Sequence, residues 1–284
     1  MTRVKLPISA FAINYNGWEY LEGCLQSLSF CEQLILVDKG SSDNSVSLAK
    51  KYTSEIYQVE WSPIVEHTRP FALEKCHHEW VLFLDHDEMI DIELMKWIEG
   101  FIRRDDDSYD AVALSRKDHY FGDWSEQQRS WPARHIRLFR KSKGRFEPRI
   151  HTSAKIDSNR IYEHQTNDGG AIIHHAYDTL EQWSSTANRY TSTTEWETAP
   201  FKTGDELFDY IDTYLNNAKA EFKRKGGGSY EAVTHTLFFM YNLLDELKKW
   251  ESHRNKNVNA IFMAQRNQLA IEISDLLKDT NQLL

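Results

Sequence analysis

The chain has 284 residues, of which 40% are hydrophobic and 13% aromatic, enough for one large domain or for a domain with a helical appendage. Its net charge of -9 argues against nucleic acid as a partner, because a nucleic-acid-binding surface needs a basic face. The sequence contains no run of about 18 apolar residues, so no membrane span is predicted.

The cysteines Cys24, Cys31 and Cys76 are odd in number and lack the spacing of a metal site. They favour buried thiols in a reducing compartment over a disulfide framework. The first residues do not have the pattern of a signal peptide. We therefore expect a cytoplasmic protein, and peripheral membrane contact stays open.

Residues 8 to 102 alternate short apolar runs with amphipathic stretches. The apolar runs predict buried strands at residues 8–13, 34–37, 56–59 and 80–84. The stretches between and after them predict helices, the first with Trp18, Leu21, Leu25 and Leu28 on one face, the later ones near residues 71–76 and 92–102. Strands that alternate with helices imply a parallel sheet with right-handed crossovers.

The pattern changes after residue 105. Short strand-like runs at 111–114, 136–139 and 171–173 lie among loops rich in Trp, Arg and His, and the chain is helical beyond residue 180. We expect an α/β core at residues 1–178 and a helical C-terminal region at residues 179–284. This region would pack on the core or form an oligomer contact, which leaves a homodimer open.

The apolar run that ends at Leu84 is followed by Asp85, His86 and Asp87. Residues i and i+2 of a strand share a face, so the two carboxylates converge. Ligands of open α/β sheets collect at the carboxyl ends of the strands, where paired carboxylates suit a hard cation that also binds phosphate oxygens. The motif predicts an Mn²⁺- or Mg²⁺-dependent enzyme acting on a nucleotide diphosphate compound. The alternative is a chance pair of acids that caps the next helix.

A second acid, Asp38, ends the second predicted strand, where a carboxylate reads a ribose or a base edge in nucleotide-binding α/β folds. A turn-forming role with the following serines is the rival interpretation. Tyr15 and Asn16 end the first strand and could stack on and hydrogen-bond a base, or form a turn at Gly17. No Gly-rich phosphate loop follows that strand, which excludes the dinucleotide fingerprint and the P-loop.

Four segments, at residues 8–16, 24–28, 37–43 and 80–88, occur in an order and at a spacing that resemble the family 2 glycosyltransferases of GT-A fold. Three further segments, at residues 120–124, 137–140 and 146–151, resemble the lipopolysaccharide-core β-glucosyltransferase-like branch. The likeness covers residues 8 to about 180. It implies an α/β, Rossmann-like fold with a mainly parallel central sheet flanked by helices, and a helical C-terminal extension.

For the donor, the resemblance implies a UDP-sugar whose uracil is held by Tyr15 and Asp38. Arg69, in the loop before the helix that leads to the metal strand, would approach the diphosphate. Asp85 would contact the ribose or metal-bound water. Asp87 would bind the metal itself.

A late histidine often supplies a further metal contact in this fold, and the resemblance makes His174 or His175 the candidate. A core histidine bonded to the backbone explains either residue equally well.

The general base is less well defined, because the chain has His151-Thr152 where relatives commonly have His-Glu. It also has Arg69-Pro70 where they have a basic residue followed by Asn. Glu147 and His151 are the nearest substitutes for the missing glutamate, with Asp118 and Asp123 behind them.

The function implied is an inverting hexosyltransferase that uses a UDP-sugar and a saccharide or glycolipid acceptor of a surface glycan. Tyr120, Phe121, Trp124 and Trp131 form either an acceptor platform or ordinary core. Two alternatives remain: an inactive sugar-nucleotide-binding protein, and a sugar-phosphate nucleotidylyltransferase. The second would need a Gly-rich basic loop that Asn14 to Gly17 does not supply.

Overall fold

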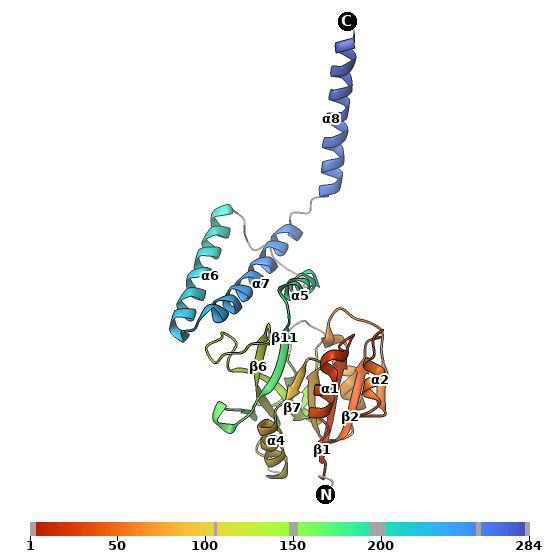
Figure 1. The fold of residues 1–284 in the computed structure, drawn as a ribbon, viewed down its shortest axis with the longest axis vertical. Coiled ribbons are helices and arrows are strands. Elements are labelled where there is room, and N and C mark those ends of the chain that lie inside the picture. Colours follow the sequence, from red (N-terminus) through yellow and green to blue (C-terminus); the bar gives the residue numbers. More distant parts are fainter. Residues whose placement is uncertain are drawn as a thin grey trace.

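The computed structural model describes residues 4–104, 107–147, 153–193, 201, 203–253 and 257–281. A nine-stranded mixed sheet forms the centre (Figure 1). Its strands, from one edge to the other, are β3 (Glu55–Gln58), β2 (Cys31–Asp38), β1 (Leu6–Asn14), β4 (Trp80–Asp85), β7 (Ala133–Arg140), β6 (Ala111–Tyr120), β11 (Ile172–Tyr177) and β5 (Glu88–Ile90), while β10 (Ile161–Glu163) also pairs with β6. A separate hairpin joins β8 (Gly144–Arg145) to β9 (Lys155–Ile156).

Most strand pairs are parallel, and the antiparallel ones are β7 with β4 and β6, and β5 with β11. The strands β1, β2 and β4 are almost continuously buried, because helices cover both faces of this part of the sheet. The predicted mainly parallel α/β fold is therefore confirmed, with the antiparallel strands on the side of the sheet that the later chain supplies.

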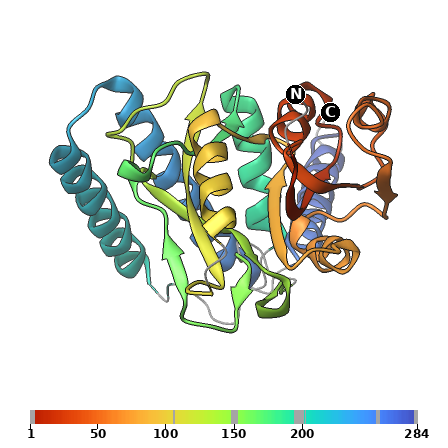
Figure 2. The ribbon, with the colours of Figure 1, turned by 90° about the horizontal axis from the view of Figure 1, so that it is seen from below.

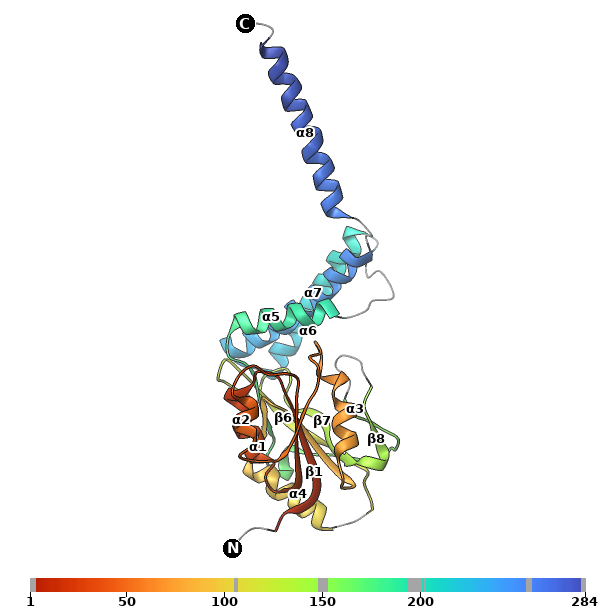
Figure 3. The same cartoon turned by 90° about the vertical axis from the view of Figure 1, so that its right-hand side faces the viewer.

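Helices α1 (Trp18–Ser27), α2 (Ser45–Ala49) and α4 (Ile92–Arg104) pack on one face of the sheet, and α3 (Arg69–Lys75) packs on the other (Figure 3). Leu21 and Leu25 of α1 are fully buried, as is Leu28 after it, but Trp18 is 49% exposed. Trp18 is the first residue of α1. Short 3₁₀ turns occupy Val65–His67, Lys141–Lys143 and Thr166–Asp168.

Where the structure describes the C-terminal region, it contains four helices: α5 (Leu180–Thr193), α6 (Gly204–Lys225), α7 (Ser229–His253) and α8 (Val258–Asn281). Thr203 and Glu206 form a capping box at the start of α6, and Gly226, with φ of 76°, ends it. Helices α5, α6 and α7 lie at the end of the core toward which β1 runs, and α8 extends away from them (Figures 1 and 3). The division at residues 178 and 179 stays a prediction.

The turn between α6 and α7 contacts the loop that follows β6. Lys225 Nζ donates to the carbonyl oxygens of Gln128 and Trp131, each at 2.8 Å, and Tyr230 donates its hydroxyl to the Asp123 carbonyl at 2.6 Å. Seen from below, α6 lies at the side of the molecule away from β1 (Figure 2). The helical region thus braces the β6–β7 side of the core.

Cys24, Cys31 and Cys76 are buried free thiols, as predicted. Within the described ranges, no helix combines the length and apolar character needed to cross a bilayer.

Candidate active site

The carboxyl ends of β1, β2 and β4 meet at one edge of the sheet. Strand register pairs Asn14 with Asp38, and Ile13 with Asp85, so the polar residues that end the three strands lie at the same level. This is the edge at which open α/β sheets bind their ligands.

Asp38 is fully buried at this edge and shapes the turn that follows it. Its carboxylate accepts hydrogen bonds from the Ser41 backbone at 2.9 Å, the Ser41 hydroxyl at 2.6 Å and the Asn14 amide at 3.1 Å. The turn-forming role considered for Asp38 is thus present in the structure. Its contact with a nucleobase stays a prediction.

Asn16 and Tyr15 behave differently from each other. Asn16 adopts a left-handed φ of 49°, and its side-chain oxygen accepts from the Ser42 backbone at 2.8 Å, so it joins two loops. Tyr15 is 39% exposed, and its ring centroid lies 6.1 Å from that of Trp61. The pair Tyr15–Trp61 offers an exposed aromatic surface beside Asp38. Trp61 was not foreseen from the sequence.

Asp85 belongs to a set of tightly paired charges, here called the arginine cluster: Asp85, Glu88, Arg69, Arg116 and Arg137. Arg69 donates to both oxygens of Asp85 at 3.1 and 3.2 Å, and Arg137 donates to it at 3.1 Å. Glu88, which is 1% exposed, accepts from Arg137 at 2.6 Å and from Arg116 at 2.9 Å. The cluster is therefore closed at its two carboxylates, each of which is held by two guanidinium groups.

Electrostatics follow from this pairing. Burial by itself raises the pKa of Asp85, but the Arg69 and Arg137 guanidinium groups outweigh it and hold that pKa well below its usual range. Arg69 begins helix α3 rather than lying in the loop before it, which corrects the predicted position. Because Arg69 reaches Asp85, its predicted approach to a diphosphate would have to coexist with this ion pair.

Asp87 belongs to a second group, the histidine cluster: Asp87, His174 and Asp118. His174 Nδ1 lies 2.7 Å from an Asp118 oxygen, and its Nε2 lies 3.7 Å from Asp87 Oδ2. Burial and the Arg116 charge lower the pKa of His174, but the bond to Asp118 and the Asp87 carboxylate outweigh them and raise it to about 9. Strand β11 runs to Tyr177, so His174 lies within the strand and not after its end, as the sequence suggested.

The second oxygen of Asp87, Oδ1, is buried without a hydrogen-bond partner among the described residues, as are the Nε atoms of Arg116 and Arg137. A buried carboxylate oxygen is costly unless a partner compensates it.

This oxygen therefore fits a metal ligand, with His174 oriented by Asp118 as a second ligand. The described residues contain no group of three or more His, Cys, Asp or Glu side chains that could enclose a metal alone. Such a two-ligand site suits Mg²⁺ or Mn²⁺, which complete their shells with phosphates and water.

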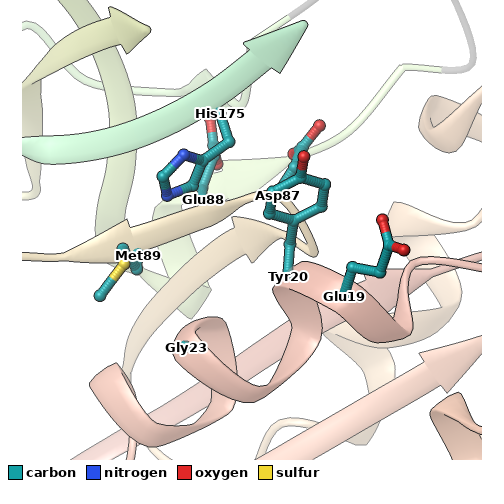
Figure 4. Close-up of a pocket in the computed structure, with 7 residues that line it drawn as sticks. All are labelled: Glu19, Tyr20, Gly23, Asp87, Glu88, Met89 and His175. Carbon is teal, nitrogen blue, oxygen red and sulfur yellow. The ribbon is translucent and has the colours of Figure 1, made fainter. Parts of the chain in front are cut away.

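Asp87 also borders a pocket of about 180 Å³ between α1, β5 and β11 (Figure 4). Tyr20 and His175 stack at its wall with ring centroids 5.3 Å apart, and Tyr20 is hydrogen-bonded to Asp178. The side chains and backbone that line it come from Glu19, Tyr20, Gly23, Asp87, Glu88, Met89 and His175. The acidic motif thus adjoins open space rather than the closed core.

Of the two predicted general bases, Glu147 lies within the described residues. Glu147 follows the β8 strand, and its carboxylate pairs with Lys155 Nζ at 2.6 Å. His151 lies outside the described residues. Asp118 is committed to His174 and to Arg116 Nε, at 2.8 Å, which makes it a poor base. The base assignment stays a prediction.

Glu88 and Arg116 are site residues that sequence reasoning missed. One signal existed, because Arg116 and Asp118 place charges at alternate positions of an otherwise buried strand. On the neighbouring loop, Trp124 and Trp131 pack edge to face at 5.2 Å, with Lys117 Nζ 4.6 Å from the Trp124 ring centroid.

A mainly parallel sheet with acids at its carboxyl edge is typical of α/β proteins that bind a ligand at that edge. Comparison with known families is specific: the model described as glycosyl transferase family 2 matches residues 9–168, more than half of the chain. The protein belongs to this family and is a glycosyltransferase. The expected family and enzyme class are confirmed.

Relatives share about a quarter of their residues with this chain. It is 26% identical over 195 residues to the lipopolysaccharide core biosynthesis glycosyltransferase LpsC of Rhizobium meliloti, covering 66% of this chain and 70% of LpsC. An uncharacterized glycosyltransferase of Rickettsia typhi is 26% identical over 194 residues, which is 65% of each protein.

Solved structures with similarity include Staphylococcus aureus TarS 1–349, with a TM-score of 0.44, 16% identity, and coverage of 87% of this chain and 91% of that one. Mycobacterium tuberculosis glucosyl-3-phosphoglycerate synthase in complex with Mn²⁺ and UDP-glucose has a TM-score of 0.33 and 20% identity, covering 41% of this chain and 44% of that one.

Proposed function

We propose that the protein transfers a hexose from a UDP-sugar, with inversion and with Mn²⁺ or Mg²⁺, to a saccharide hydroxyl of a surface glycan or glycolipid. Family membership supports sugar transfer, and the similarity to LpsC supports a lipopolysaccharide-type acceptor. The observation that carries the metal-dependent part is the buried Asp87 Oδ1, which lacks a partner within the described part of the chain, beside His174.

Asp87 and His174 would hold the cation, and Asp118 would fix the orientation of His174. A divalent cation bound there would neutralise charge that develops on the departing diphosphate. Asp85 would contact the ribose or a water molecule on the cation. Arg69 and Arg137 fix the Asp85 carboxylate in place.

The uridine would lie at the other end of the same edge. Tyr15 and Trp61 supply an aromatic surface for the base, and the turn held by Asp38 supplies backbone groups beside it. Asn16 would act through this turn, because its side-chain oxygen already accepts from Ser42.

The acceptor would approach from the side of Glu147. Inversion needs one base that draws the proton from the attacking hydroxyl while the anomeric carbon is attacked from the face opposite the diphosphate. Glu147 is the carboxylate proposed for this role, with His151 as the alternative. The loop of Trp124 and Trp131, anchored by Lys225, would form the sugar platform.

The test is UDP release from a panel of UDP-sugars, with Mn²⁺ and lipopolysaccharide-core saccharides as acceptors. We expect one donor to give acceptor-dependent release that chelation with EDTA abolishes. Asp209→Asn, at an exposed carboxylate on α6, is the matched control for Asp87→Asn and should retain wild-type turnover. Turnover that persists after complete metal removal would defeat the metal-dependent part of the proposal.

A further inference from the structure

Lys39 is a buried cation at the edge where β1, β2 and β4 end. It follows Asp38 directly, its backbone N–H donates to the Asn14 carbonyl at 2.9 Å, and the residue is 4% exposed. Its ammonium group lies 6.0 Å from the centroid of the Trp61 ring. Lys39 therefore lies near Trp61 of the aromatic pair, at the edge of the proposed donor site.

No counterion accompanies this charge. Among the described residues, the Lys39 ammonium has no hydrogen bond and no carboxylate within 4 Å. The nearby carboxylates belong to other partners, because Asp85 pairs with Arg69 and Arg137, and Glu66 pairs with Arg69 at 3.7 Å. An ammonium group without a counterion is unfavourable in a residue that is only 4% exposed, and a bound anion would compensate its charge.

A second cation, on the C-terminal helix α5, acts electrostatically on Lys39. Arg189 lies on α5, the helix above this edge, with its guanidinium carbon 5.1 Å from the Tyr190 ring centroid. Burial, reinforced by the Arg189 charge, lowers the pKa of Lys39 to about 8, although Glu66 and Asp85 act in the opposite direction. Two like charges thus converge from distant parts of the chain, which disfavours the empty site and favours an anion between them.

We propose that Lys39 and Arg189 bind the diphosphate of a nucleoside diphosphate sugar, so that the C-terminal helix α5 completes the donor site. This inference rests on the proposed function and names two residues for it. It differs from the expectation for Arg69, whose guanidinium is already shared by Asp85 and Glu66. Lys39 would carry most of the affinity because it is buried, and Arg189 less because it is exposed.

The experiment is calorimetric titration of the full chain, in Mn²⁺, with UDP, uridine and inorganic pyrophosphate. Lys39→Met should weaken UDP and pyrophosphate binding about tenfold or more, the usual effect of losing a charged contact, while uridine affinity stays unchanged. Lys39→Arg should restore UDP binding to within a few fold. Arg189→Met should give a smaller loss, and Lys50→Met, at an exposed lysine, none.

A stability measurement separates ligand binding from a structural role. Without nucleotide, Lys39→Met should unfold at the same or a higher urea concentration than the wild type, because the substitution removes an uncompensated buried charge. A structural lysine would instead lower that midpoint.

The remaining outcomes of the titrations each exclude either the anion site, the uridine donor or both. Equal UDP affinity of Lys39→Met and wild type overturns the anion site, as does a loss of uridine affinity as large as that of UDP. A wild type that binds pyrophosphate but not UDP keeps the anion site and defeats the uridine donor. A wild type that binds neither defeats both.

Discussion

Asp85 and Asp87 lie two residues apart, yet the arginine cluster around Asp85 is closed and the histidine cluster around Asp87 is open. Asp85 receives three hydrogen bonds from two guanidinium groups. Asp87 has a histidine 3.7 Å away and one buried oxygen to which no described residue donates. We expect fully paired carboxylates to support the fold and a buried carboxylate oxygen without a partner to bind a ligand. We therefore expect Asp85 to contribute more to stability and Asp87 more to cation binding.

The largest effect is expected from replacing Asp87, which should reduce sugar transfer without reducing stability. Asp87→Asn should reduce sugar transfer at least about a thousandfold, because charge stabilisation of the departing diphosphate is lost. Its urea midpoint should stay close to that of the wild type, since Asp87 makes few internal bonds. Initial-rate assays and urea denaturation of the same preparation check both expectations. Strong unfolding by this substitution would contradict an open cluster.

On the closed side the substitution should act mainly on stability. Asp85→Asn leaves Arg69 and Arg137 buried without their shared counterion, which costs about 3 to 5 kcal/mol of unfolding free energy. Urea denaturation measures the loss, with Asp209→Asn as the control at an exposed carboxylate. A loss no larger than that of the control would show that the arginine cluster does not support the fold.

The orientation of His174 gives a smaller effect. Asp118→Asn removes the carboxylate that bonds His174 Nδ1, so Mn²⁺ affinity in the presence of UDP should fall about 10- to 100-fold. Electron paramagnetic resonance of free Mn²⁺ measures this affinity. Retention of wild-type affinity would mean that His174 is held by other contacts or is no ligand.

The smallest effect is the change at low pH in the contribution that Asp85 makes to stability. Because the pKa of Asp85 is held below its unfolded value, its contribution to stability is complete above about pH 4 and is lost as pH falls toward the depressed folded value. The gap in unfolding free energy between wild type and Asp85→Asn should therefore narrow below about pH 4. Urea denaturation at pH 7, 5 and 3 tests this, and a gap that widens on acidification would reverse the sign.

Much of the fold is predictable from local pattern. The strands β1, β2 and β4 are apolar runs bounded by acids or turns, so their positions follow from the sequence alone. The extension of β11 through His174 does not follow, because that strand carries histidines and is stabilised by pairing with β6 and β5. Tertiary pairing decides such a polar strand.

The site also contains residues that the sequence predicts and residues that it does not. Asp38, Asp85 and Asp87 could be found because each lies at or just beyond the end of a recognisable strand. The pairing of Arg137 with Glu88, 49 residues apart, and the isolation of Lys39 depend on distances that no local pattern encodes. Charge partners are a property of the folded chain.

The role of Asp87 as a metal ligand is most directly tested by a crystal structure of the protein with UDP and Mn²⁺. We expect the ion to be bound to Asp87 Oδ1 and to contact diphosphate oxygens, with the uracil beside Tyr15 and Trp61. An ion bound away from Asp87, or UDP bound at this edge with Asp87 facing neither metal nor phosphate, would contradict it.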